Sequence, residues 1–231
     1  MKEEKLTQRE SYEIASKYQF ASEIIHLGPW TSYSMLHDPK HMCFVLARYK
    51  FAAKMLEGKD DVLEIGCGDA FGIPIVAQGV KSVLGIDVDD RLIADNSIRL
   101  KSIKNIKFQK NNICEGCPNR VFDAAYSIDV IEHLDAGLEK SFMDNTVKCL
   151  TENGVYICGT PNITANQYAT ERSAIQHINL KSPKTLKELM LQYFENVFMF
   201  SMNDEVLHTG YAPMGHYLFA VGAGKKDRKK R

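Results

Sequence analysis

The sequence predicts an α/β fold, a doubly wound Rossmann-like sheet beneath a helical N-terminal cover. From Asp61 onward, short apolar segments alternate with polar or helical stretches: VLEI, SVLGI, FDAAYSI and VYICG. Strands that are buried on both faces and separated by helices are typical of a parallel sheet. The 231 residues contain no internal repeat and no interdomain linker, so we expect a single domain with a substantial core.

Residues 1–60 are expected to form the helical cover of the functional site. Asp38 and Pro39 are typical of a helix N-cap and of the first helical residue. Apolar residues then recur at helical spacing as far as Leu56, and Gly58 is typical of a helix stop. The aromatic stretch before this helix, HLGPWTSYSMLH, is expected to be irregular.

The predicted core covers residues 61–224 and ends in one helix and two strands. Ser182 and Pro183 open the helix, whose apolar residues share one face. VFMFS and YLFAVG follow as the two strands. Residues 225–231 form a basic run, which we expect to be a disordered, solvated tail.

Composition excludes several classes of protein. Acidic and basic residues balance at 29 each, so no overall charge favours a nucleic-acid partner. The six scattered cysteines are typical of a reducing cytoplasm rather than of a secreted disulfide framework. No apolar run is long enough for a membrane span, and the first residues do not resemble a signal peptide. We therefore expect a cytoplasmic globular protein with neither nucleic-acid binding nor membrane insertion.

The first predicted strand runs into a glycine-rich turn, Gly66-Cys67-Gly68, just after Glu64. The fingerprint of an NAD site needs a third glycine where this chain has Phe71. A carboxylate at Glu64 would repel a pyrophosphate and attract an ammonium and a sulfonium. Asp87 ends the next strand, at the spacing that binds both hydroxyls of a ribose. S-adenosylmethionine (SAM) carries these charges and no phosphate, so we expect SAM rather than NAD.

Six stretches between Val62 and Met190 resemble the class I SAM-dependent methyltransferases. They are VLEIGCGDAFG, GIDVDD, FQKNN, FDAAYSIDVIEHL, ENGVYICGTPN and HINLKSPKTLKELM. The last two resemble the small-molecule branch, which includes the ubiquinone-pathway O-methyltransferases. The resemblance implies seven strands in the order 3-2-1-4-5-7-6, with strand 7 antiparallel.

The resemblance also implies the residues that bind SAM and its product, S-adenosylhomocysteine. They are Glu64, Gly66, Cys67, Gly68, Asp87, Val88, Asn112, Ile113, Ser127, Ile128 and Asp129. Asn112 stands where the family has an aspartate that contacts adenine. A neutral amide there would accept the bond from the adenine amino group through its oxygen.

The catalytic candidates are His133, which follows the fourth strand, and His177, which begins the segment before the last helix. An imidazole has a pKa suited to removing a proton from an acceptor, although His133 could instead only orient its loop. The candidates for acceptor binding lie in the cover and in the loops after the fifth strand. They are Trp30, Tyr33, His37, Thr160, Asn162 and Arg172.

Two patterns raise the question of a metal. Asp129, Glu132 and His133 could act as ligands together, but three donors so close in sequence rarely converge. The single CxxC motif at Cys114 and Cys117 is a weak signal for zinc without a second pair. We therefore expect no metal.

These observations predict a SAM-dependent methyltransferase that acts on an oxygen or nitrogen of a small polar acceptor. The polar stretch NITANQYATERSAIQHINLKS suits a sugar, a nucleotide-linked sugar or a cell-surface glycan precursor, and Arg172 and Lys181 could meet a phosphate there. Two alternatives stay open: a SAM-binding interaction protein without catalysis, and an NAD-linked oxidoreductase. Both a monomer and a homodimer fit the sequence.

Overall fold

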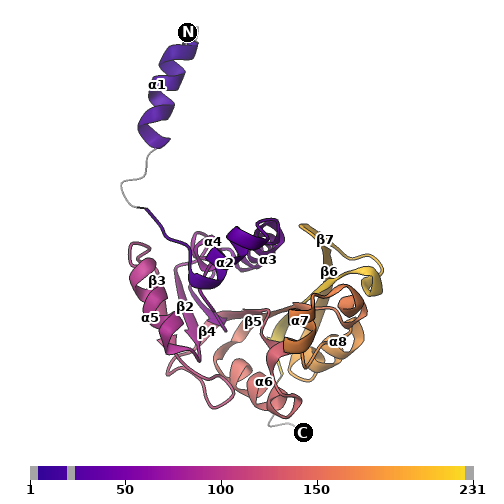
Figure 1. Cartoon of the computed structure of the whole chain (residues 1–231). Coiled ribbons are helices and arrows are strands. Elements are labelled where there is room, and N and C mark those ends of the chain that lie inside the picture. Colours follow the sequence, from indigo (N-terminus) through magenta and orange to yellow (C-terminus); the bar gives the residue numbers. More distant parts are fainter. Residues whose placement is uncertain (1–4, 20–23, 227–231) are drawn as a thin grey trace.

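The computed structural model describes residues 5–19 and 24–226, and its centre is one mixed sheet (Figure 1). Five strands run parallel: β1 (Asp61–Ile65), β2 (Ser82–Asp87), β3 (Ile106–Lys110), β4 (Phe122–Ile128) and β5 (Leu150–Pro161). Three more complete the sheet: β6 (Phe194–Asn203), β7 (Val206–His208) and β8 (Tyr217–Lys225). The strand order is β3-β2-β1-β4-β5-β8-β6-β7, so the predicted doubly wound sheet is confirmed.

The C-terminal strands agree with the expected order and add one strand to it. β8 corresponds to the expected seventh strand, and it lies antiparallel between β5 and β6. The expected count of seven is corrected to eight by β7, which pairs with the end of β6 through three residues. A strand this short, with a polar flank on each side, carries too little alternation to be recognised in the sequence.

Helices cover both faces of the sheet. α3 (His41–Leu56) and α4 (Ile73–Ala77) contribute to one hydrophobic cluster, and Ile93 of α5 (Asp90–Arg99) packs against it. α6 (Glu139–Lys148) and α8 (Pro183–Leu191) pack in a second cluster that includes Phe142 and Leu186. The remaining short elements are η1 (Ile131–His133), η2 (Ala136–Leu138), η3 (Ile163–Tyr168), α7 (Glu171–Gln176) and η4 (Ala212–Met214).

The described part of residues 1–60 is helical, with one correction. The aromatic stretch expected to be irregular contains α2 (Pro29–His37), which begins with Gly28 as its N-cap and proline at the first helical position. α3 begins at His41 rather than at Pro39, because Asp38 closes α2 and a turn intervenes. α1 (Gln8–Gln19) stands apart from the sheet in Figure 1.

The chain's C-terminal strand reaches further than expected. β8 ends at Lys225, and the backbone N–H of Lys226 donates to the carbonyl of Tyr193 at 2.9 Å. The predicted disordered tail at 225–231 is therefore corrected at its first two residues, and 227–231 lie outside the described residues. None of the described helices has the length and apolar character needed to cross a membrane.

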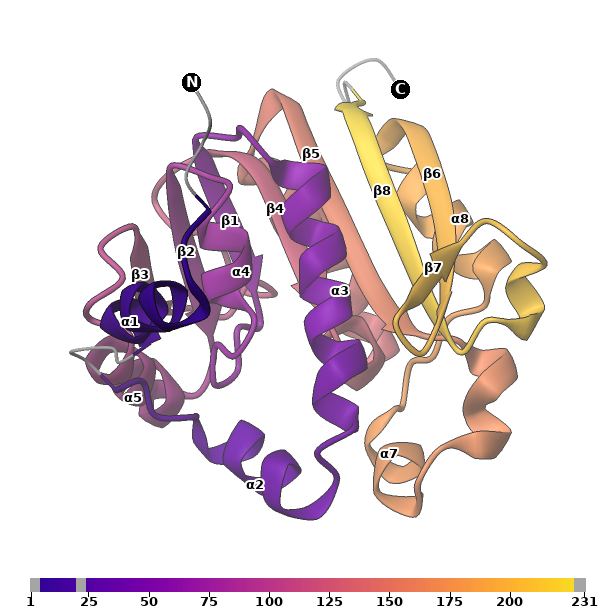
Figure 2. The same cartoon turned by 90° about the horizontal axis from the view of Figure 1, so that it is seen from above.

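The topology fixes where a ligand can bind. The strand order reverses between β1 and β4, and ligands bind in doubly wound sheets at the carboxyl ends of strands beside such a reversal. Figure 2 shows α2 and α7 beyond this end of the sheet, with α3 crossing one face. The loops after β1, β2, β4 and β5 therefore form one candidate site.

Candidate active site

Two adjoining cavities lie at the carboxyl ends of the strands. The larger has a volume of about 690 Å³ and the smaller about 220 Å³. Trp30, Gly66 and Asp129 line both, so they mark the boundary between the two spaces. The predicted cofactor residues that line the larger cavity are Asp87, Val88, Asn112 and Ile113, and those that line the smaller are Cys67, Gly68 and Ile128.

The glycine loop needs glycine for both conformation and space. Gly66 and Gly68 have φ values of 72° and 51°, in the left-handed region that side chains disfavour. A Cβ at Gly66 would lie 2.5 Å from a methyl group of Val130, and one at Gly68 would lie 2.9 Å from the ring of Trp30. Trp30, predicted to contact the acceptor, therefore packs directly on the loop predicted to hold the cofactor.

Asp87 is held in place at the edge of the larger cavity. One of its carboxylate oxygens accepts a hydrogen bond from the backbone N–H of Gly68 at 2.9 Å, and the other from that of Asp89 at 3.0 Å. These bonds tie the end of β2 to the glycine loop after β1. The carboxylate is thus fixed beside the cavity, where the sequence expects the ribose.

Two adjacent asparagines line the larger cavity, and the sequence analysis named only the second of them. The side-chain oxygen of Asn112 accepts the backbone N–H of Cys114 at 3.1 Å, so a local turn already uses the predicted adenine contact. Its neighbour Asn111 also lines the larger cavity. The buried oxygen of Asn111 has no hydrogen-bond partner among the described residues. The only signal in the sequence was the pair of adjacent asparagines.

Glu64 requires the largest correction. It is 1% exposed, and its two oxygens accept hydrogen bonds from the hydroxyls of Tyr49 and Tyr126 at 2.9 and 2.8 Å. Burial raises its pKa to about 8, so the group is mostly protonated near neutral pH. Glu64 lines neither cavity, and both of its oxygens are bonded to tyrosine hydroxyls instead of facing a ligand as the sequence predicted.

Ser127 and Asp129, at the end of β4, were both predicted to contact the cofactor, but they lie in different surroundings. Ser127 points into the core, where its hydroxyl shares a hydrogen bond with that of Tyr156 at 2.7 Å, so its predicted cofactor contact is corrected. Asp129 has a φ of 58° and lines both cavities. Its carboxylate forms an ion pair with Arg48 at 2.7 Å.

Arg48 is a second residue that the sequence analysis missed. Its buried guanidinium lies 3.8 Å from the ring centroid of Tyr217 and 5.4 Å from that of Phe44. Burial is the largest single influence on Arg48 and would lower its pKa, but Asp129, Tyr217 and Glu132 together raise that pKa above its ordinary value. The available signal was its position on α3 among apolar residues that recur at helical spacing, which predicts a buried side chain.

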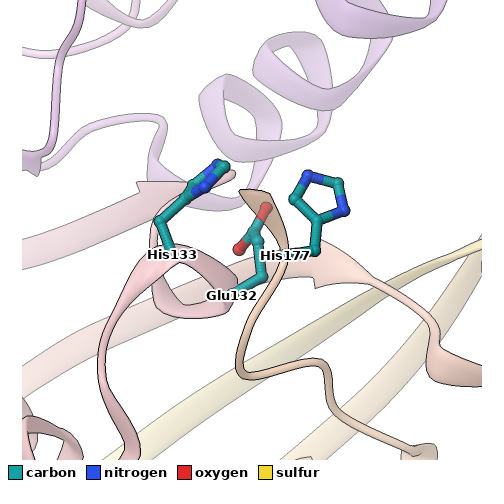
Figure 3. Close-up of side chains that lie close together, drawn as sticks. All are labelled: Glu132, His133 and His177. Carbon is teal, nitrogen blue, oxygen red and sulfur yellow. The ribbon is translucent and has the colours of Figure 1, made fainter. Parts of the chain in front are cut away.

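The structure brings the two catalytic candidates together. The rings of His133 and His177 have centroids 5.1 Å apart and are nearly perpendicular, and Figure 3 shows the carboxylate of Glu132 between them. His133 lies at the end of η1 and lines the larger cavity, whereas His177 caps the C-terminus of α7. Burial, followed by the nearby His133, lowers the pKa of His177.

The predicted acceptor residues are distributed differently from expectation. Tyr33 and His37 stack on each other on the exposed side of α2 with centroids 4.0 Å apart, and neither lines the two cavities. Thr160 is buried, and its hydroxyl donates to a carboxylate oxygen of Glu132 at 3.0 Å. Trp30 therefore remains the predicted acceptor residue that lines these cavities.

Three more polar residues were candidates for contact with the acceptor or its phosphate. Two of them are bonded to other parts of the chain, and the side chain of the third lies outside the described residues. Asn162 is 1% exposed, and its amide donates to the carbonyls of Ala212 and Gly215, so its predicted acceptor contact is corrected. Lys181 pairs with Glu139, which removes it as a free phosphate contact. Arg172 belongs to α7, but its side chain lies outside the described residues.

Comparison with known proteins identifies a family. Residues 35–196 match the family described as "Methyltransferase domain". A probable S-adenosylmethionine-dependent methyltransferase from Mycolicibacterium smegmatis is 30% identical over 115 residues, which are 49% of this chain and 42% of that protein. The match thus spans less than half of the length of that relative.

Solved structures of methyltransferases share the fold. The N-methyltransferase NodS from Bradyrhizobium japonicum WM9, in complex with S-adenosyl-L-homocysteine, has a TM-score of 0.60 and 18% identity, over 93% of this chain and 98% of that one. The DhpI-SAH complex has a TM-score of 0.63 and 15% identity, over 85% of this chain and 92% of that one. With the family match over most of the sheet, these findings establish that the chain belongs to the class I SAM-dependent methyltransferases.

Proposed function

We propose that this protein transfers the methyl group of SAM to an oxygen or nitrogen of a small polar acceptor. The observation that carries the proposal is the shared wall of the two cavities, formed by Trp30, Gly66 and Asp129, with His133 nearby in the larger one. A cofactor that fills both cavities would have its sulfonium at this wall. The volume of the larger cavity falls within the range of small-molecule sites.

The lining residues support an orientation for the cofactor. The ribose would lie against Asp87, whose carboxylate can accept from both hydroxyls, and the adenine would lie toward Asn111. The methionine part would follow the glycine loop into the smaller cavity, beneath α2 and α3. This arrangement gives the N-terminal residues 1–60 the proposed role of a cover.

The chemistry needs little beyond alignment. The sulfonium is already a strong electrophile, so the main task is to hold the acceptor atom in line behind the methyl group. Orientation of this kind contributes about 7–11 kcal/mol to rate acceleration. The acceptor would enter from the side of His133 and His177, where it meets two imidazoles 5.1 Å apart.

The histidines suit an acceptor that must lose a proton. Removal by a base requires a neutral imidazole, and the lowered pKa of His177 keeps its ring neutral near pH 7. A polar segment, η3 and α7, leads to His177. This polarity, together with the resemblance to the small-molecule branch, supports a hydroxyl-rich acceptor such as a sugar, a nucleotide-linked sugar or a glycan precursor.

Calorimetry and product detection test the proposal together. SAM should bind to the full chain, NAD should not, and Asp87→Ala should weaken SAM binding by about 1–3 kcal/mol. Asp90→Ala is the matched control, because Asp90 is the exposed first residue of the following helix, α5, and pairs with Lys110. Formation of S-adenosylhomocysteine should then depend on an added sugar or amine. SAM binding without product from any acceptor class would contradict methyl transfer.

A further inference from the structure

We propose that Glu132, His133 and His177 bind a divalent transition-metal ion on the acceptor side of the cofactor cavity. Each residue offers one ligand atom, and these atoms all lie within 4.8 Å of one another. Figure 3 shows the carboxylate of Glu132 between the two rings. The ligands come from two separate segments, η1 after β4 and the end of α7, so the fold creates the cluster rather than proximity in sequence.

An unpaired atom at the centre of the cluster points independently to a cation. Glu132 is fully buried, and Thr160 donates to one of its carboxylate oxygens at 3.0 Å. The other oxygen, Oε1, has no hydrogen-bond partner among the described residues. Buried carboxylate oxygens in proteins are almost always paired or bound to a metal. Arg48, the nearby buried cation, interacts with Glu132 electrostatically but donates its hydrogen bond to Asp129.

The surrounding contacts already orient the ligands. Nδ1 of His133 lies 3.2 Å from the carbonyl oxygen of Gln176. Because a carbonyl only accepts, Nδ1 carries the proton and Nε2 keeps its lone pair for a metal, an arrangement usual for metal-binding histidines. The backbone N–H of Asn179 donates to the carbonyl of Glu132 at 3.0 Å, which ties the segment after His177 to η1.

The donor set suggests the type of ion. Two imidazole nitrogens and one carboxylate oxygen suit Zn²⁺, Fe²⁺, Co²⁺ or Mn²⁺ rather than Ca²⁺ or Mg²⁺. Three protein ligands leave coordination positions open, as in catalytic rather than structural sites. This proposal departs from the sequence expectation of no metal, since the third ligand is the distant His177 and not Asp129, whose carboxylate is paired with Arg48.

The location gives the ion a role that rests on the proposed function. His133 also lines the larger cavity, so an ion bound to it lies between that cavity and α7. An oxygen or nitrogen of the acceptor can occupy an open position, which orients it and lowers the pKa of a bound hydroxyl. Both histidines would then hold the ion, so neither would act as the general base.

Metal titration tests the site without any acceptor. The 231-residue chain, freed of metal by chelation, should bind about one Co²⁺ or Zn²⁺ per chain, as measured by visible absorption and calorimetry. His177→Ala and Glu132→Gln should each weaken binding by at least about 10-fold. His208→Ala is the control, because His208 bonds to Asn203 on the sheet edge, far in the fold from this cluster. Retained SAM binding shows that each variant is folded.

The outcomes separate this proposal from the proposed function. Metal affinity in His177→Ala equal to that of His208→Ala would overturn the site, as would the absence of binding in the parent protein. Metal binding through these residues without methyl transfer would uphold the site and refute the proposed function. Methyl transfer at an unchanged rate in metal-free protein would overturn the role of the ion in acceptor binding. Activity lost in His177→Ala but independent of metal would support a histidine base instead.

Discussion

The proposed cofactor side and the proposed acceptor side of this site are built in different ways. On the cofactor side, the glycine loop and Asp87 come from two consecutive strands, and backbone N–H groups hold them together. On the acceptor side, side chains from α3, η1 and α7 meet only in the folded chain. A local motif can therefore specify the first half, whereas the second depends on tertiary packing. Substitutions in each half test this difference.

The largest expected effect is on the pH dependence of stability through Glu64, because this residue belongs to the cofactor motif and yet is part of the core. Its pKa of about 8 lies above the ordinary value of 4.5, so the folded state binds this proton more tightly than the unfolded state does. Its contribution is complete below about pH 4.5 and is lost as the pH rises to about 8. Within that window the free energy of unfolding should fall by up to about 1.4 kcal/mol per pH unit.

Urea unfolding of the parent and of Glu64→Gln between pH 4.5 and 8.5 measures this contribution. The glutamine variant should lose this part of the pH dependence, because its side chain does not titrate. If the free energy of unfolding depended on pH in the same way in both proteins, Glu64 would be ionised in the core. The carboxylate that the sequence predicts would then be correct.

Arg48 tests the acceptor side. Removing one partner of a buried ion pair costs about 3–5 kcal/mol, but Asp129 is 32% exposed and solvent reduces that cost. We expect Arg48→Met to lower the free energy of unfolding by roughly 2–3 kcal/mol. Arg91→Met, which removes an exposed pair with Asp89, should change it by less than about 0.5 kcal/mol. Equal losses of stability in chemical denaturation would show that the buried ion pair contributes no more than the exposed one.

Gly66 tests whether the backbone alone defines the cofactor side. An alanine there must adopt a positive φ, which costs about 1–2 kcal/mol, and it must also displace Val130. Gly66→Ala should therefore lower stability by at least this amount and weaken SAM binding in calorimetry. Gly116→Ala is the control, since a Cβ at Gly116 meets nothing within 4 Å. Unchanged SAM affinity in Gly66→Ala would place the cofactor away from this loop.

The two asparagines provide the smallest and most selective test. Asn111→Ala should weaken SAM binding by about 1 kcal/mol, because it removes an unpaired, buried oxygen from a residue that lines the larger cavity. Asn112→Ala should affect binding less, since its oxygen serves the turn at Cys114. Calorimetry on both variants decides between them. The reverse order of effects would restore Asn112 as the adenine contact.

The sequence predicted those parts that depend on local chemistry. Strands β1, β2, β4 and β5 follow from short apolar runs, and the glycine loop follows from backbone needs that few residues other than glycine meet. The polar strand β3 was covered only by the family resemblance. The sequence did not show that Ser127 bonds in the core or that Asn162 bonds to a loop. The spacing of apolar residues and the family motifs do not indicate which way a side chain at the end of a strand points. Arg48 and Asn111 were missed for the same reason, since their importance depends on contacts that form only in the folded chain.

Trp30 is the only tryptophan in the sequence, and it lies at the boundary of the two cavities with its ring against Gly68. The residue is 58% exposed in this structure. All of the tryptophan fluorescence of the unlabelled protein therefore comes from this one position. A ligand that enters either cavity changes the surroundings of that single indole, so the intrinsic emission spectrum is a direct optical signal of occupancy at the boundary of the two cavities.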